Sequence, residues 1–204
     1  MPKIIGNSLS EHRAQVRTRV FEVLRKQLYE RGFDAVSLAS VAAEAQLGRT
    51  AMYNHFPDKE SLLVAFVEDE ATRYVRRLSE AIAAHADPID KLATFVRLQL
   101  QVLAEYHMPA GTALASALAP AAYRRISAHA DPITDKLREI LTEGMRTRRL
   151  PAEDPDILIP MITSALASRS VVDVPPEQLE HAIEAAVRFV LRAVGATETP
   201  EKTS

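Results

Sequence analysis

A short polar stretch at residues 49–59 carries side chains that can bond to DNA bases and phosphates. It reads RTAMYNHFPDK, and on a helix of about 3.6 residues per turn Thr50 and Asn54 lie opposite Met52. In a major groove an arginine fork pairs with guanine and an amide pairs with adenine. The candidate contact residues are Ser37, Arg49, Thr50, Ala51, Tyr53, Asn54, His55 and Lys59. Their chemistry indicates recognition of double-stranded DNA.

Two short helices joined by a tight turn are predicted to hold these side chains. The first begins after Ser37, a suitable N-cap, and its apolar stripe consists of Leu38, Val41, Ala42 and Ala45. Gly48 marks the turn before a second helix over about residues 49–55. Met52 and Phe56 anchor that helix from its inner side. The polar face therefore points outward from a helix-turn-helix unit.

Residues 14–66 resemble the helix-turn-helix domain of the TetR family of transcriptional regulators. The resemblance rests on Gly32, Phe33, Ser37, Leu38, Val41 and Ala42, followed by RTAMYNHFPDKESLL at 49–63. Gln46 stands where the family usually has a turn glycine, and Gly48 stands where it usually has a Ser or Thr N-cap. The resemblance implies a homodimer that binds an inverted-repeat operator, and a C-terminal domain that usually holds a small-molecule effector. Repression released by a small, largely apolar molecule is the expected sense of regulation.

The composition removes several kinds of chemistry. The chain of 204 residues contains no cysteine, so disulfides and thiolate nucleophiles are absent. Its 6 glycines are widely spaced and form no phosphate-binding loop. Its 6 histidines never fall three or four residues apart, so we predict no metal site and no cofactor. We therefore expect a protein that is not an enzyme.

Charge and hydropathy favour a DNA-facing N-terminus and a cytoplasmic protein. Residues 1–60 contain nine Lys or Arg and seven Asp or Glu, so their net charge is positive. The remaining residues contain 16 Lys or Arg and 20 Asp or Glu, so their net charge is negative. No apolar signal segment follows Met1. The longest uncharged run, 106–123, contains Pro109, Gly111 and Pro120, so we predict no contact with a membrane.

Apolar periodicity predicts an all-α fold of about nine helices and no sheet. The first helix starts at the capping-box pair Ser8 and Glu11, and a long helix spans 59–83. The remaining helices are predicted at 88–107, 111–118, 120–129, 132–149, 155–172 and 176–194. The predicted domains are a DNA-binding head at 1–57, a ligand-binding and dimerisation domain at 58–195, and a tail at 196–204.

Arg13, Arg17 and Arg25 share one side of the first predicted helix. From there they could reach DNA phosphates, and an ordinary solvated basic face explains them equally well. The long helix 59–83 is expected to act as a lever that joins effector binding to the spacing of two DNA-reading heads.

An effector pocket is expected in the second domain because the family usually has one there. Its candidate lining residues mix apolar bulk with a few polar groups: Phe95, Gln99, Leu103, Tyr106, His107, Met108, Tyr123, Met145, Met161 and Ser164. Core packing is the alternative for each of them.

Two C-terminal helices carry more apolar surface than a thin domain can cover, which favours self-association. The candidate dimer residues are Leu166, Leu179, Ile183, Val187, Val190 and Leu191. Two other functional classes stay open on sequence grounds. They are an all-helical protein-interaction module and an enzyme whose site is assembled from distant residues.

Overall fold

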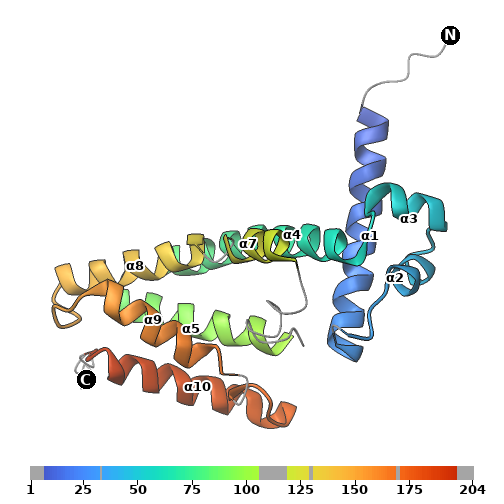
Figure 1. The fold of residues 1–204 in the computed structure, drawn as a ribbon. Coiled ribbons are helices and arrows are strands. Elements are labelled where there is room, and N and C mark those ends of the chain that lie inside the picture. Colours follow the sequence, from blue (N-terminus) through green and yellow to red (C-terminus); the bar gives the residue numbers. More distant parts are fainter. Residues whose placement is uncertain (1–6, 33, 106–118, 129–130, 169–170, 197–204) are drawn as a thin grey trace. The chain divides into compact units, whose positions relative to one another are not determined.

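The computed structural model describes residues 7–32, 34–105, 119–128, 131–168 and 171–196. These residues form α-helices and turns with no β-strand among them, which confirms the all-α class (Figure 1). The helices are α1 (Asn7–Arg31), α2 (Leu38–Glu44), α3 (Arg49–His55), α4 (Lys59–Ala83), α5 (Pro88–Glu105), α7 (Pro120–Ala128), α8 (Asp131–Arg146), α9 (Pro155–Leu166) and α10 (Pro176–Ala193).

The helix bounds differ from the predictions at a few ends. Helix α1 begins at Asn7, so Ser8 lies inside the helix rather than at its N-cap position. Helix α9 stops at Leu166, short of the predicted end at residue 172. The predicted helix is too long because the apolar pattern continues into the following turn. Val172 of that turn is only 7% exposed and packs into the core. The helix predicted at 111–118 lies outside the described residues.

Contacts divide the chain into two compact units. The first contains the described residues up to Asp69 together with those from 119 to Ile126, and the second contains the others. The core of the first unit is formed by α1 around Phe21 and Leu24, by α2 and α3, and by Leu62 and Phe66 of α4. The Phe21 ring meets the Phe66 ring edge-on, with centroids 5.6 Å apart. This packing fixes α2 and α3 against α1.

Helix α7 packs on the first turns of α4 within the same unit. Leu63 and Val64 of α4 form a small apolar cluster with Ala122 of α7. An ion pair between Arg125 and Glu68 adds a polar contact beside that cluster. The first unit therefore includes a segment from well beyond the helix-turn-helix region.

The core of the second unit is centred on α5. Helices α8, α9 and α10 all contact α5, whose Leu92, Val96 and Leu100 are completely buried. Gly144 lets α8 approach the turn that follows it, since a Cβ at this position would lie 2.7 Å from Leu150 Cδ1. Helix α4 contributes to this core as well, through Tyr74, Leu78 and Ile82. One continuous helix thus supplies side chains to both cores.

Ion pairs on the second unit make its stability depend on pH. Arg149 Nη2 donates to Asp87 Oδ2 at 2.7 Å, and this bond holds the pKa of Asp87 below its usual 3.8. Arg97 Nε donates to Glu184 Oε1 at 2.7 Å and lowers the pKa of that carboxyl in the same way. A carboxyl with a lowered folded pKa adds stability that is present above its unfolded pKa of about 4 and lost as pH falls through the folded pKa.

We expect the free energy of unfolding to fall as pH drops below about 4, where these carboxylates protonate. Urea unfolding of the wild type between neutral and acid pH measures the slope. Asp87→Asn should be less stable at neutral pH and should show a shallower acid dependence. Equal slopes for the two proteins would contradict the assigned role of the Asp87 pair.

Candidate nucleic-acid interface

Helix α2 is fixed at its start by a reciprocal cap. Ser40 N–H donates to Ser37 Oγ at 3.0 Å, and Ser37 N–H donates to Ser40 Oγ at 3.1 Å. This capping box satisfies two amides that the helix itself cannot bond. Ser37 is exposed, and its hydroxyl proton stays available to a phosphate oxygen.

A buried amide ties α2 to α1. Gln27 is 1% exposed; its Nε2 donates to Glu44 Oε2 at 2.8 Å, and its Oε1 accepts from Ser40 Oγ at 2.9 Å. Lys26 Nζ also donates to Glu44, at 2.7 Å. Both ends of α2 are thereby held at a defined position on α1. Gln27 is not among the residues predicted from the sequence, because its only signal is a polar side chain between apolar positions of a helix.

The turn between α2 and α3 bends at Gln46. Its φ of 55° lies in the left-handed region that favours glycine. Leu47 N–H donates to Ala42 O at 2.9 Å and Gln46 N–H donates to Ala43 O at 3.2 Å, which together close the helix in a Schellman motif. Gln46 therefore occupies the glycine position of the turn and keeps its geometry. Gly48 is the N-cap residue of α3, so α3 starts without a side-chain cap.

Helix α3 presents the predicted polar face. Met52 and Phe56 are 1% and 5% exposed and anchor the helix in the core. The outer residues Arg49, Thr50, Ala51, Tyr53 and Asn54 are exposed, and His55 is half-buried. The structure thus brings the predicted contact residues of α3 together on one surface. Arginine, threonine and asparagine donors on such a surface match the edges of base pairs.

An aromatic contact orders this surface. The Arg49 guanidinium carbon lies 5.7 Å from the centroid of the Tyr53 ring, one helical turn away. Tyr53 is 45% exposed, so the pair stands at the surface. At such a site a cation–π contact contributes about 0.5–1 kcal/mol.

The next helix starts beside the interface. Ser61 N–H donates to Asp58 Oδ1 at 2.6 Å, and this bond lowers the pKa of Asp58. The negative cap is favourable at a helix N-terminus. Lys59 follows and is half-buried, so its role as a phosphate contact stays a prediction.

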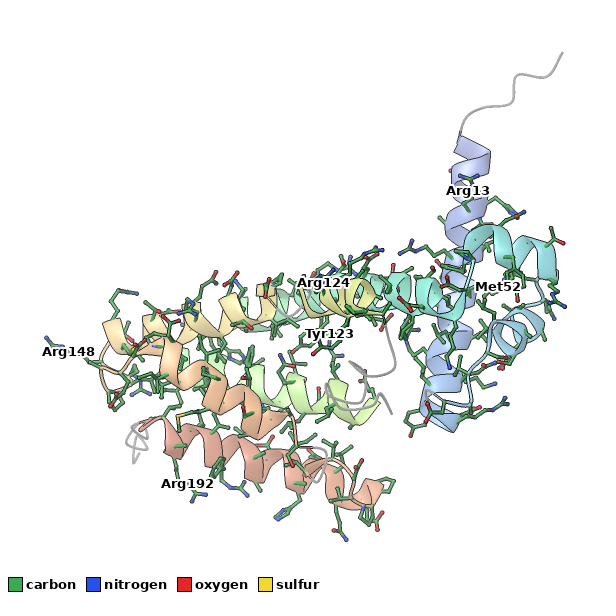
Figure 2. The ribbon with its side chains drawn as sticks, viewed as in Figure 1. Arg13, Met52, Tyr123, Arg124, Arg148 and Arg192 are labelled. Atoms are coloured by element: carbon green, nitrogen blue, oxygen red, sulfur yellow. The ribbon has the colours of Figure 1, made fainter. Side chains whose placement is uncertain are left out.

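The arginines of α1 have different surroundings. Arg17 Nη2 donates to Ala65 O of α4 at 3.1 Å, and its guanidinium lies 4.8 Å from the Phe21 ring centroid. Arg25 lies 6.0 Å from the Phe66 ring centroid. These two side chains therefore contact α4 from α1, and phosphate binding by the arginines of α1 stays a prediction. Arg13 is exposed on α1 (Figure 2).

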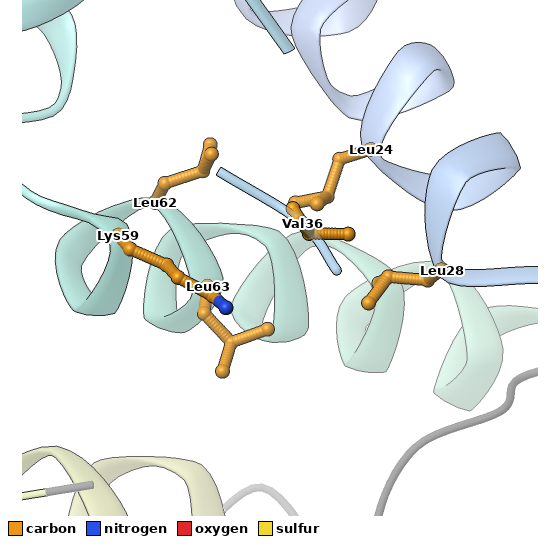
Figure 3. A pocket seen from close by; sticks show the side chains of 6 residues that line it. All are labelled: Leu24, Leu28, Val36, Lys59, Leu62 and Leu63. Atoms are coloured by element: carbon orange, nitrogen blue, oxygen red, sulfur yellow. The ribbon is translucent and has the colours of Figure 1, made fainter. Parts of the chain in front are cut away.

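A small cavity lies within the first unit. Its volume is about 10 Å³, and Leu24, Leu28, Val36, Lys59, Leu62 and Leu63 line it (Figure 3). A void of this size holds at most one water molecule, and all of its lining residues except Lys59 are apolar. We regard it as a gap in packing with no capacity for an effector.

Six of the candidate effector-lining residues lie in the second unit, and Tyr123 lies in the first. Phe95, Leu103 and Met145 share the core of the second unit. Phe95 is 1% exposed in the core of the second unit, Met145 packs against that core, and Gln99 and Leu103 are half-buried. Tyr123 packs against the α4–α7 cluster of the first unit (Figure 2). Met161 and Ser164 are exposed on α9. Tyr106, His107 and Met108 lie outside the described residues.

The candidate dimer residues are mostly used inside the chain itself. Leu166, Ile183, Val187 and Val190 are 2–8% exposed and belong to the core around α5. Leu179 and Leu191 are half-buried against the same core. Their apolar stripe faces α5, which leaves these side chains little area for a partner. The large apolar side chains that remain exposed on the described α9 and α10 are Ile157, Met161 and Phe189, at 60%, 65% and 57%.

The described residues contain neither a candidate metal site nor a membrane-spanning helix. No group of three or more His, Asp or Glu side chains there has the spacing to hold a metal ion. None of the described helices is both long and apolar enough to cross a bilayer.

Family models match both parts of the chain. Residues 20–66 match the model for bacterial regulatory proteins of the tetR family. Residues 85–170 match the model for a tetracyclin repressor-like C-terminal domain. Together the two matches cover the helix-turn-helix region and most of the second unit.

Similar proteins include a transcriptional regulator and a nucleoid occlusion factor. The HTH-type transcriptional regulator TtgR of Pseudomonas putida is 31% identical over 104 residues, which are 50% of this chain and 48% of TtgR. The nucleoid occlusion factor SlmA of Pasteurella multocida is 28% identical over 82 residues, or 40% of each chain. This chain therefore spans about half the length of the first relatives it matches.

Solved structures share the fold at low sequence identity. The reduced form of E. coli NemR superposes with a TM-score of 0.73 at 16% identity, covering 90% of this chain and 100% of NemR. The fatty acid degradation regulator FadR of Bacillus halodurans gives 0.70 at 17% identity, covering 89% and 97%. At these identities the likeness establishes the fold alone.

Proposed function

We propose that this chain, which belongs to the TetR family of bacterial regulatory proteins, is a dimeric transcriptional regulator that binds an inverted-repeat operator through α3. The observation that carries the proposal is the α3 surface, where five exposed residues stand on a helix anchored by Met52 and Phe56. An exposed helix of this kind reads base edges when it lies in a major groove. We propose that the protein represses transcription. We also propose that it is located in the cytoplasm, because its operator DNA is found there.

A salt titration of binding to double-stranded DNA tests this function. Neutralised phosphates release counterions, so the affinity of a DNA-binding protein falls steeply with salt. We expect salt-dependent binding by the wild type and weaker binding by Arg49→Ala. Binding that neither responds to salt nor changes on substitution of Arg49 would favour the protein-interaction module instead.

The proposed dimer face consists of the outer sides of α9 and α10. Ile157 and Met161 are exposed although α9 already buries Ile159, Ile162 and Leu166 on its other side. A helix that is apolar on both sides is usually covered on both. Phe189 is a further exposed apolar side chain, on α10, and is proposed to belong to the same face. Two copies that pack these helices together would form a four-helix bundle and present two α3 helices.

The second unit is the proposed site of effector control. Tyr74 is 9% exposed, and its hydroxyl has no hydrogen bond in the described structure, so burial raises its pKa. An unpaired buried hydroxyl costs about 1–3 kcal/mol, which a ligand with one polar group could recover. We propose a largely apolar effector with a hydrogen-bonding group that meets Tyr74.

Tyr74→Phe is expected to raise the free energy of unfolding by on the order of 1 kcal/mol, because it removes the unpaired hydroxyl and keeps the ring. Thermal unfolding without added ligand measures the change. Tyr74→Leu serves as the control, since it also removes ring volume and should destabilise the protein. A Phe variant that is less stable than the wild type would show that the hydroxyl has a partner.

Helix α4 is the proposed link between effector and operator. It supplies Leu62 and Phe66 to one core and Leu78 and Ile82 to the other. A ligand shifts DNA affinity only by its preference between two conformations, at about 1–3 kcal/mol for typical coupling. The test is a reciprocal titration with compounds that raise the melting temperature. Compounds that stabilise the protein and leave operator affinity unchanged at saturation would count against this link.

A further inference from the structure

We propose that Tyr53 is a positioning residue for Arg49, holding its guanidinium so that the N–H edge faces a guanine in each half-site. The inference rests on the proposed reading of DNA by α3. It assigns separate tasks to two parts of one side chain. The ring of Tyr53 orders Arg49, and the hydroxyl remains free to donate to a phosphate oxygen.

The geometry supports the first task. Arg49 and Tyr53 are four residues apart on α3, and the guanidinium carbon lies 5.7 Å from the ring centroid. Contacts within about 6 Å of an aromatic face are attractive for a cation. No carboxylate of the described residues pairs with Arg49, so the ring is its intramolecular partner. Both side chains are exposed and therefore reach a ligand together.

The chemistry of arginine allows both contacts at once. Stacking uses the flat face of the guanidinium, whereas its N–H donors lie in the plane of the group. A guanidinium held by its face can therefore give two parallel hydrogen bonds to O6 and N7 of guanine. A lysine at this position would keep the charge and lose the fork.

Ordering the side chain before binding explains why the ring matters for specificity. A free arginine carries about 2 kcal/mol of rotamer entropy, part of which must be given up when it bonds a base. A side chain already held by a ring gives up less of it at that step. The advantage applies to the base that Arg49 meets and to no other base of the operator. Loss of the ring should therefore change preference at one position of each half-site.

The test selects binding sites from a duplex library with a randomised central region, for the wild type, Tyr53→Phe and Tyr53→Leu. The Phe variant should keep the guanine preference and bind all sequences more weakly, because it lacks only the hydroxyl. The Leu variant should lower the preference for that guanine about 2- to 5-fold, the equivalent of the 0.5–1 kcal/mol of an exposed cation–π contact. In an Arg49→Ala background, Tyr53→Leu should have no further effect at this base.

Lys59→Ala, at the start of α4, is the control, and it should weaken binding without changing any base preference. Helical content and melting temperature check that each variant folds, and Tyr53→Met repeats the test should the Leu variant fail to fold. A ring-deleted variant that folds and keeps the full guanine preference would overturn the inference. Absence of salt-dependent DNA binding by the wild type would instead refute the proposed function, so the two failures are distinguishable.

Discussion

Replacing Met161 or Phe189 with glutamate is expected to convert the protein to monomers and to lower its operator affinity by about 100-fold or more. The two residues are 65% and 57% exposed, so the fold of the single chain tolerates the charge. In the proposed dimer the same charge is buried without a partner, which is strongly unfavourable. A monomer presents one recognition helix and loses the gain of binding two half-sites together.

Light scattering and DNA titration on the same samples measure this effect. Val187→Glu provides the contrast, because Val187 is 3% exposed in the chain's own core and its substitution should unfold the second unit. Surface variants that fold normally yet remain dimeric would show that the outer sides of α9 and α10 are not the interface. A wild type that is monomeric at micromolar concentration would remove the dimer altogether.

Arg49→Ala and Thr50→Ala should each relax sequence preference, at a cost of about 1–3 kcal/mol when the lost contact is to a base. Lys59→Ala should instead weaken binding to all sequences and reduce the salt dependence by about one counterion. Site selection with each variant separates these outcomes. An unchanged consensus for both the Arg49 and Thr50 variants would mean that α3 does not read bases at these positions.

Local signals predicted the helices of the candidate site, because each of these helices is defined by neighbouring residues. Ser37, Gly48 and Asp58 mark the helix starts, and the structure has α2, α3 and α4 beginning directly after them. The anchoring roles of Met52 and Phe56 follow from helical spacing alone. These features depend on contacts between residues that are close together along the chain, and a sequence pattern can indicate such contacts.

Contacts between distant segments could not be predicted in the same way. Arg17 donates a hydrogen bond to a backbone carbonyl 48 residues away, and Gln27 of α1 donates a hydrogen bond to Glu44 of α2. In both cases the sequence shows only a polar residue on a helix. Apolar periodicity likewise predicts which side of α10 is covered without identifying what covers it. The stripe of Ile183, Val187 and Val190 packs against the chain's own α5, and periodicity alone does not distinguish such a contact from a dimer interface.

Selection of binding sites from the randomised duplex library by the wild-type protein tests the central claim most directly. A two-fold dimer that reads DNA with two α3 helices should enrich an inverted repeat, with half-site centres about one helical turn apart or somewhat more. Each half-site should contain the guanine that Arg49 contacts. Recovery of sequences with no shared motif, or of a motif without two-fold symmetry, would contradict the account.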